Sequence, residues 1–232
     1  MSKTLALIPA RAGSKRIPGK NVRPLLGQPL IRWTMDFAKA YAGFDEVLVS
    51  TDCPRVAEIA TGLGLSPPWS RPPELAGDHA STLAVVLHAL DACERQGQVF
   101  QRLALLQPTT PLRRAEHWDL ARRHLDTGAP AAVGVSPVAQ HPCWTYWLGE
   151  DGQMKPCLPG MQGGRSQELP PAAALNGALY LIDVATLRAA RTFVPEGVRA
   201  VPMCDPLESI DIDTEADWQE AERSLAQVLG TI

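Results

Sequence analysis

The sequence predicts a three-layer α/β fold with a mainly parallel sheet. Short apolar runs alternate with segments of helical periodicity along most of the chain. That alternation implies βαβ units, whose strands run parallel between two layers of helices. With 232 residues, 45% of them hydrophobic, the chain is long enough to bury one full core. We therefore expect a single domain over residues 1–232.

Each expected element has its own local pattern. Leu30, Trp33, Phe37 and Tyr41 recur at spacings of three and four, which is typical of a helix packed on a core. The expected strands are Leu5–Pro9, Glu46–Ser50, Leu103–Leu106, Ala131–Val135, Gly177–Ile182 and Ser209–Asp213. The expected helices are Leu30–Tyr41, Arg55–Leu63, Ala115–Leu125 and a terminal helix that begins near Thr214, with Asp217 three residues later as in a capping box.

Residues 136–175 interrupt this alternation. The segment is rich in Pro, Gly and Gln, carries Trp144 and Trp147, and has no helical period. Its aromatic side chains favour burial over disorder. We expect a small inserted lobe, and its low charge makes it a candidate interface between two copies of the chain.

Charge and cysteine content exclude several classes of protein. Lys and Arg number 22 against 25 Asp and Glu, a net charge of −3. A duplex nucleic acid or an anionic membrane would favour a basic excess, so neither is an expected partner. The five cysteines are scattered and never form a CxxC pair. The apolar run at the start of the chain is too short for a signal peptide. A cytoplasmic enzyme is expected.

A polar loop follows the first expected strand, with the sequence Ile8-Pro-Ala-Arg-Ala-Gly-Ser-Lys-Arg-Ile-Pro-Gly-Lys-Asn21. Its glycines permit close backbone approach to a ligand, and Arg11, Lys15, Arg16 and Lys20 place four cations within ten residues. The pattern is neither GxGxxG nor GxxxxGK[ST], which excludes dinucleotide and P-loop signatures. A solvated basic loop is the alternative. Its position after a buried strand favours a site for phosphates.

Two later segments carry further candidate ligands. Asp211 and Asp213 are separated by one residue in a strand-like run, so both carboxylates are expected on one face, where they are able to share Mg²⁺. Alternatively, Asp213 serves the N-terminus of the terminal helix. Gln107 follows the expected strand Leu103–Leu106 in a proline-bounded loop, which indicates either a substrate contact or a rigid turn.

Six motifs in order resemble the CMP-sialic acid synthetases and related cytidylyltransferases, including the legionaminate and pseudaminate enzymes. The motifs span the chain: residues 8–21, 50–52, 71–82, 106–113, 165–178 and 208–214. The resemblance implies a three-layer Rossmann-like nucleotidyltransferase with an inserted dimerisation lobe. It further implies transfer of CMP from CTP to the anomeric hydroxyl of a nine-carbon (nonulosonic) sugar acid, with Mg²⁺ as cofactor, pyrophosphate as product and a homodimer as the assembly.

The resemblance also assigns residues. It implies contacts to the nucleotide from Ala10, Arg11, Ala12, Gly13, Ser14, Lys15, Lys20, Asn21, Arg71, Ala80 and Thr82. The implied contacts to the sugar acid are Gln107, Arg165 and Asn176, with Arg165 beside the sugar carboxylate, and the implied metal ligands are Asp211 and Asp213. Arg11, Lys20, Arg165 and Asp211 are the expected catalytic residues. Without the resemblance, Arg71 and Arg165 are also compatible with ordinary surface loops.

Departures from the family pattern fall on the sugar side. Pro171 to Leu175 lacks an aromatic that relatives often carry, and residues 140–144 lack the lysine of some sialate-specific members. N-acetylneuraminate, legionaminate and pseudaminate therefore stay open as substrates, while the eight-carbon acid of lipopolysaccharide is disfavoured. The alternatives are a nucleotidyltransferase for another sugar acid or sugar phosphate, and a catalytically silent nucleotide-binding domain. Intact Asp211 and Asp213 disfavour the silent domain.

Overall fold

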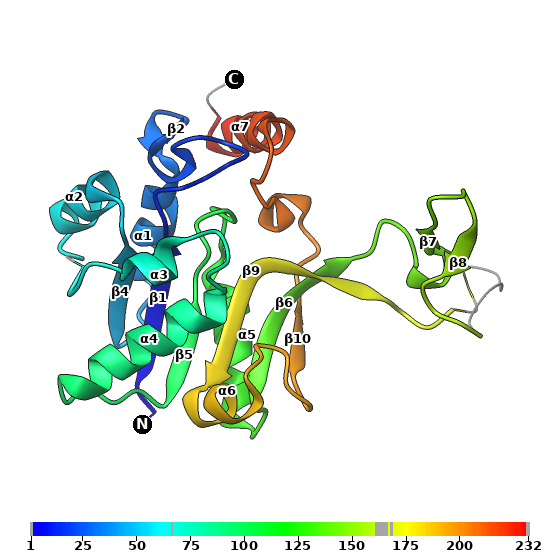
Figure 1. The fold of residues 1–232 in the computed structure, drawn as a ribbon. Coiled ribbons are helices and arrows are strands. Elements are labelled where there is room, and N and C mark those ends of the chain that lie inside the picture. Colours follow the sequence, from blue (N-terminus) through cyan, green and yellow to red (C-terminus); the bar gives the residue numbers. More distant parts are fainter. Residues whose placement is uncertain (1, 66, 161–166, 168, 231–232) are drawn as a thin grey trace.

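The protein is built on a central six-stranded sheet with the strand order β10-β6-β9-β5-β1-β4 (Figure 1). The computed structural model describes residues 2–65, 67–160, 167 and 169–230. The strands of the sheet are β1 (Thr4–Ala10), β4 (Glu46–Thr51), β5 (Arg102–Leu105), β6 (Ala131–Pro137), β9 (Ala173–Asp183) and β10 (Arg199–Pro202). Each expected strand up to residue 182 is present, with bounds that differ by a few residues.

The strands of the sheet run parallel except for β9. β1 pairs in parallel with β4 and β5, and β10 pairs in parallel with β6. β9 lies between β5 and β6 and is antiparallel to both. It follows β6 through the insertion at residues 138–172 and pairs with it directly, which needs no crossover helix. The expected mainly parallel sheet is confirmed.

Helices cover both faces of the sheet. They are α1 (Leu30–Ala40), α2 (Pro54–Gly62), α3 (Pro73–Ala76), α4 (Thr82–Arg95), α5 (Ala115–Asp126), α6 (Val184–Ala190) and α7 (Glu215–Leu229). Met35 of α1 and Trp118 of α5 belong to one buried cluster with Ile8 of β1. Leu90 of α4 and Leu187 of α6 belong to the other cluster. Alternate residues of β1 thus serve opposite faces, and the three-layer α/β fold is confirmed.

Helix α4 has no counterpart among the elements expected from the sequence. Ser81 caps it by accepting a hydrogen bond from the backbone amide of Ala84. Val86, Ala89 and Leu90 are buried on its sheet-facing side. Their spacing is a helical signal of the ordinary kind. The helix begins at Thr82, directly after a loop that reaches the cavity described below.

The expected strand Ser209–Asp213 is wrong. A short 3₁₀ helix, η4 (Pro206–Ser209), occupies its start, and residues 210–213 form no strand. Ile212 is fully buried while Asp211 is exposed, so the apolar alternation that suggested a strand is real. The amide of Ile212 donates instead to the carbonyl of Thr109, a loop residue, at 2.8 Å. Alternation of burial does not require a sheet partner.

The described residues between β6 and β9 (138–160, 167 and 169–172) lie outside the sheet on an arm. The ends of β6 and β9 continue as a two-stranded ribbon, which carries η2 (Pro142–Trp144) and the hairpin of β7 (Tyr146–Leu148) and β8 (Met154–Pro156). Figure 1 shows this hairpin projecting away from the body. Trp147 is 69% exposed and Leu148 is 77% exposed. The assignment of residues 136–175 as a separate lobe within one domain stays a prediction.

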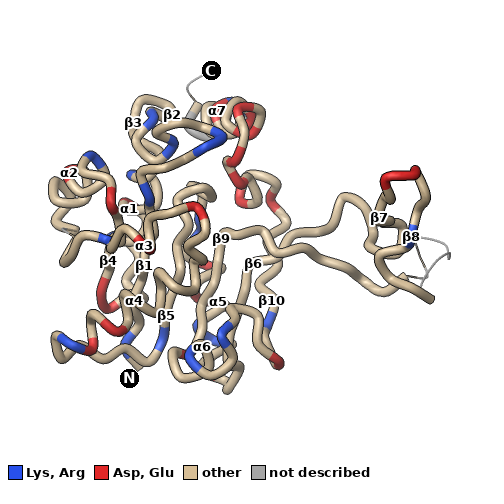
Figure 2. The backbone as a smooth tube through the Cα atoms, viewed as in Figure 1, with Lys and Arg blue, Asp and Glu red and all other residues tan. Residues whose placement is uncertain are grey.

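The segment that follows β1 packs against the C-terminal helix α7 beside the sheet. After β1 come η1 (Lys20–Val22) and the small hairpin of β2 (Pro24–Leu25) and β3 (Gln28–Pro29). Ile17 and Leu25 from this segment share a buried cluster with Trp218 of α7. Figure 2 places basic residues of the N-terminal loop beside acidic residues that lead into α7.

All five cysteines are free thiols. Within the described part of the chain, no helix combines the length and the hydropathy that a membrane crossing requires.

Helix α7 begins with a complete capping box. The Thr214 hydroxyl accepts from the backbone amide of Asp217, and the Asp217 carboxylate accepts from the amides of Asp213 and Thr214 at 3.0 and 2.7 Å. Partial burial raises the pKa of Asp217, but the hydrogen bonds that its carboxylate accepts outweigh burial and lower the pKa overall. The expected capping interaction is confirmed, with aspartate in place of the more usual glutamate.

We predict that Asp217→Ala destabilises the protein by about 1 kcal/mol at pH 7, the usual contribution of a capping side chain. Because the folded-state pKa is lowered, this stabilisation is present above the unfolded pKa near 4 and disappears as pH falls through the folded value. Thermal unfolding of both proteins from pH 7 to pH 3 measures it. The exposed Gln219→Ala is the control. A pH-independent difference for Asp217→Ala would contradict the charge-based account.

Candidate active site

A cavity of about 400 Å³ opens at the edge of the sheet where β1, β4 and β5 end. These strands are parallel, so the loops that follow them meet at one edge, the usual ligand site of an open α/β sheet. The cavity gathers nine residues that the sequence singled out: Arg11, Ser14, Lys20, Asn21, Arg71, Ala80, Thr82, Gln107 and Asp213. It is also lined by Pro9, Leu75, Gly77, Asp78, Val85, Pro108 and Thr109.

The loop after β1 is held in place by its neighbours. The backbone amide of Ala12 donates to Asp52, which follows β4, at 2.9 Å. The side-chain amide of Asn21 donates to the carbonyl of Arg11 at 3.0 Å, which closes the loop on itself. Gly19 has a φ of 67°, a left-handed conformation that glycine adopts without strain, just before η1. The loop therefore has a defined path over the cavity.

The four cations of this loop face two carboxylates. Arg11 and Lys15 pair with Asp78 at 3.0 and 2.7 Å, and hydrogen bonding from Lys15 lowers the pKa of Asp78. Arg16 and Lys20 pair with Asp213 at 2.9 and 3.0 Å. Lys15 and Arg16 are largely exposed, and such pairs are weak in water. A polyphosphate that enters the cavity competes with Asp78 for the cations on its side.

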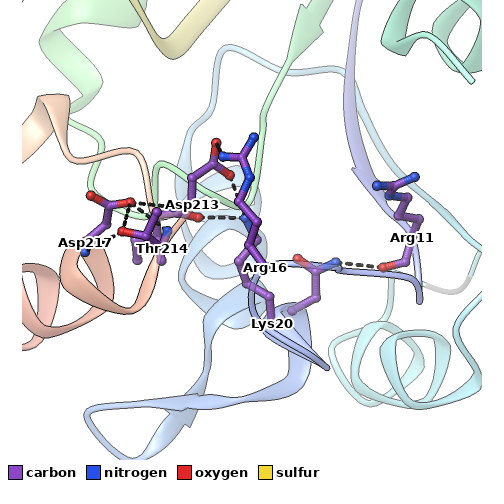
Figure 3. A network of polar contacts seen from close by, with 8 residues as sticks. Arg11, Arg16, Lys20, Asp213, Thr214 and Asp217 are labelled. Carbon is purple, nitrogen blue, oxygen red and sulfur yellow. Dashed lines mark hydrogen bonds and ion pairs between the residues drawn. The ribbon is translucent and has the colours of Figure 1, made fainter. Parts of the chain in front are cut away.

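Lys20 connects the loop after β1 to the segment before α7 within the site (Figure 3). It is 8% exposed, and its ammonium donates to the carbonyl of Ile212 at 2.6 Å and to Asp213 at 3.0 Å. The other carboxylate oxygen of Asp213 accepts from Arg16 at 2.9 Å. The backbone amide of Asp213 in turn donates to Asp217. Asp213 thus serves the cationic loop, and its backbone serves the start of α7.

Gln107 and Asp211 meet at Gly177 of β9. A Cβ atom built on Gly177 would lie 3.1 Å from Oε1 of Gln107 and 3.8 Å from Oδ2 of Asp211. Gly177 also has a φ of 74°, so a side chain there is disfavoured both by contact and by conformation. The carboxamide of Gln107 therefore extends from the cavity toward Asp211. Asp211 itself does not line the cavity.

Arg71 forms the buried wall of the cavity near the end of β4. It is 5% exposed, its Nε donates to the Ser50 hydroxyl at 3.1 Å, and its Nη2 donates to the Ser50 carbonyl. Burial lowers the pKa of Arg71, while the nearby Asp52 opposes that effect. Ala80 and Thr82 line the adjacent wall at the start of α4. A planar cation held this firmly is suited to directional contacts with a ligand.

Asn176 does not reach the cavity. Its Nδ2 lies 3.1 Å from both the Ser136 hydroxyl and the sulfur of Met203, and its Oδ1 accepts from the amide of Ala178. A Cβ on Gly134 would lie 2.6 Å from the same Oδ1, at the irregularity between β6 and β9. Its amide therefore stabilises the junction of β6, β9 and β10. The predicted sugar contact of Asn176 stays a prediction.

The remaining predicted site residues differ in placement. Arg165 lies outside the described residues, so its assignment to the sugar carboxylate stays a prediction. Ala10, Ala12, Gly13 and Lys15 belong to the strand end and loop beside the cavity without lining it.

Several site residues were not assigned a role from the sequence. Asp52 fixes the loop, Asp78 neutralises its cations, and Arg113 holds the Gln107 loop from below. Asp52, Asp78 and Arg113 lie within the motifs at residues 50–52, 71–82 and 106–113, respectively. Their position inside these motifs is the feature of the sequence that could have identified them. Their bonding partners lie far away in sequence, which local patterns cannot identify.

The donor set fits a hard cation. Asp211 is an exposed carboxylate, and no hydrogen bond or ion pair engages it among residues 2–65, 67–160, 167 and 169–230. Asp213 is 46% exposed and shares its oxygens with Arg16 and Lys20. One or two carboxylates plus substrate oxygens suffice for Mg²⁺, which keeps several waters. No cluster of three or more His, Cys, Asp or Glu ligands occurs in the described portion.

Fold and cavity together define an α/β protein with a cavity lined by basic side chains at the carboxyl edge of its sheet. Residues 5–133 match the family described as Cytidylyltransferase. The chain is similar to CMP-N,N'-diacetyllegionaminic acid synthase of Legionella pneumophila, 35% identical over 228 residues that cover 95% of each chain. It is also similar to the pseudaminic acid cytidylyltransferase of Campylobacter jejuni, 32% identical over 179 residues and 77% of each chain.

The chain belongs to the cytidylyltransferase family. Its fold is similar to that of a solved CMP:2-keto-3-deoxy-manno-octonic acid synthetase, with a TM-score of 0.71 and 22% identity over 97% of this chain and 99% of that one. The family and fold inferred from the six motifs are confirmed.

We predict that the two aspartates differ in their effect on stability. Asp213→Ala leaves the buried ammonium of Lys20 with the Ile212 carbonyl alone. Asp213→Ala should lower the free energy of unfolding by about 1 to 2 kcal/mol. This is less than for a fully buried pair because Asp213 is 46% exposed. Asp211→Ala should change stability by less than about 0.5 kcal/mol. Urea unfolding measures both, and equal losses would show that the Lys20 pair contributes nothing.

Proposed function

We propose that this protein transfers CMP from CTP to the anomeric hydroxyl of a nonulosonic acid and releases pyrophosphate. The observation that carries the proposal is the cavity, which combines the cationic loop, the buried arginine wall and Gln107, whose side chain extends toward the nearby Asp211. The three features differ in chemistry: the first suits a polyphosphate, the second a base and the third a polyhydroxylated acid. The printed names of the relatives, a legionaminic and a pseudaminic acid enzyme, support the same reaction.

In this mechanism the sugar hydroxyl attacks the α-phosphorus of CTP in line with the departing pyrophosphate. Arg11 and Lys20 hold the phosphates and offset the charge that accumulates on them, with Lys15 at the rim. Lys20 is already fixed by Ile212 and Asp213, so its charge needs no reorganisation when the substrate binds. Such preorganised charge and positioning supply most of the rate enhancement in phosphoryl and nucleotidyl transfer.

Base recognition is assigned to the wall formed by Arg71, Ala80 and Thr82. Nε and Nη2 of Arg71 already donate hydrogen bonds to the hydroxyl and the carbonyl of Ser50. We assign the remaining Nη1, with backbone groups near Ala80 and the Asn21 region, to cytosine and ribose. On the opposite side, Gln107 and Arg165 are assigned to the sugar acid.

Mg²⁺ is the proposed cofactor, held by Asp211 with Asp213 as a shared ligand. When bound, the ion would neutralise phosphate oxygens of CTP. Asp211 is the stronger candidate because its carboxylate is unengaged in the described part of the chain. Asp213 must divide its oxygens between the ion and two side-chain cations.

The proposed activity is tested by pyrophosphate release with CTP and a panel of N-acetylneuraminate, legionaminate and pseudaminate. We expect turnover with at least one of them, lost on chelation with EDTA and restored by Mg²⁺. The kcat/KM for CTP should exceed that for UTP by about 10³-fold. A buried polar site built for one base leaves some of its hydrogen-bonding groups unpaired when another base binds. Release of pyrophosphate with none of the acids, or equal rates with CTP and UTP, would refute the proposal.

We propose further that the protein works as a cytoplasmic homodimer formed through the β7–β8 arm. Tyr146, Trp147, Leu148 and Met154 are exposed together on a hairpin that contacts little of its own chain. Exposed apolar side chains of this size usually mark an interface. Free thiols at all five cysteines suit a reducing compartment.

Light scattering at micromolar concentration should give twice the chain mass for the unmodified protein. The double variant Trp147→Ser/Leu148→Ser should shift it toward the monomer. Val99→Ser, which alters an apolar residue of the body that is 57% exposed, should leave the mass unchanged. A monomeric unmodified protein would refute the dimer, and a dimeric double variant would place the interface elsewhere.

A further inference from the structure

Arg113 lies beneath the loop that carries Gln107, between that loop and helix α1. Its Nη2 donates to the carbonyl of Gln107 at 2.5 Å and to the hydroxyl of Thr110 at 3.0 Å. Its Nη1 donates to the hydroxyl of Thr34, a fully buried residue of α1, at 2.9 Å. One guanidinium therefore fastens both ends of a loop turn to a helix of the neighbouring layer.

The turn that Arg113 holds is tightly closed. The Gln107 carbonyl also accepts from the amide and the hydroxyl of Thr110, at 3.3 and 3.1 Å. Pro108 and Pro111 restrict the backbone on either side of it. The orientation of the whole turn relative to the sheet is then set by the arginine, because its planar fork fixes the direction of each bond.

The positive charge of Arg113 is unusual for a residue whose only role is to hold two segments of the chain together. Its three acceptors are neutral oxygens, and no carboxylate pairs with it in the described residues. Its Nε is buried without a hydrogen-bond partner, and burial lowers the pKa of Arg113 to about 9. Burying a cation without an ionic partner is unfavourable, and a neutral apolar side chain at this position would avoid that penalty.

The turn carries Gln107 and also contacts the segment that contains Asp211 and Asp213. The side chain of Gln107 reaches the point near Gly177 where Asp211 also approaches. The carbonyl of Thr109, in the middle of the turn, accepts from the amide of Ile212 between the two aspartates. A displaced turn would move Gln107 directly, whereas the Asp211–Asp213 segment is also held by the bonds of Lys20 to Ile212 and Asp213.

We propose that Arg113 is the positioning residue that orients Gln107 toward the sugar acid. The proposal rests on the function proposed above, because it assigns Gln107 to the sugar side. Arg113 acts through Gln107 and does not touch the nucleotide, whose cations and arginine wall lie on the other loops. Its unpaired charge, set behind a site for anionic substrates, adds a favourable field at the same place.

A double-mutant cycle separates this role from general support of the fold. Arg113→Lys keeps the charge but loses the fork. We expect it to lower kcat/KM for the sugar acid about 10-fold or more, and to leave KM for CTP within about twofold. In a Gln107→Ala background, the same substitution should cost less than about twofold, because its target is already gone. The exposed Arg123→Lys on α5 is the matched control and should change none of these values.

Thr34→Val supplies a second variant, since it releases the α1 end of the clasp and leaves Arg113 in place. It should show the same dependence on Gln107 with a smaller loss. Equal losses of kcat/KM with and without Gln107, or a rise in KM for CTP that matches the rise for the sugar acid, would overturn the proposal. Absence of activity in the unmodified protein would instead refute the proposed function itself, and this inference with it.

Discussion

The contact of Lys20 with Ile212 and Asp213 is the interaction on which the rest of the site depends. It joins the loop after the first strand to the segment before the last helix, 192 residues apart. A buried ammonium needs both acceptors, so the loop and the C-terminal segment reach their final positions together. Apolar packing of Ile17 with Trp218, and the guanidinium of Arg23 placed 4.3 Å above the Trp218 ring, reinforce the same junction. Helix α7 is therefore part of the active-site scaffold.

Charge in the cavity is balanced locally. Asp78 and Asp213 neutralise the cations of the loop, which explains how a chain of net charge −3 contains a site for a polyanion. The two carboxylates differ in what they do. Asp78 pairs with the partly exposed Arg11 and the largely exposed Lys15, cations that a phosphate group can take over. Asp213 holds Lys20, whose position is fixed by backbone on the other side. In the proposed reaction, substrate binding would exchange ion pairs at the rim and leave the Lys20–Asp213 pair in place.

The walls of the cavity are stiffer than its rim. Bonds to hydroxyl and carbonyl oxygens fix both Arg71, which lines the cavity near the end of the edge strand β4, and Arg113, which lies behind the loop that follows β5. Neutral acceptors hold these arginines without cancelling their charge. The field of both guanidiniums therefore stays available to an anionic ligand, in a region where water screens it weakly. Rigid walls with an exchangeable rim suit a reaction in which two anions must be brought into contact.

The sequence by itself determined the layers, the parallel core and most of the cavity. Helical spacing and buried runs are local properties, and a cation-rich loop after a buried strand has one usual place in an α/β fold. Only the tertiary structure decided the direction of β9, the irregular path around Ile212 and the use of Asn176 inside the sheet. It also supplied the partners of Arg113. Each of these depends on which distant backbone group accepts or donates a hydrogen bond, and a linear pattern of polar and apolar residues contains no record of that choice.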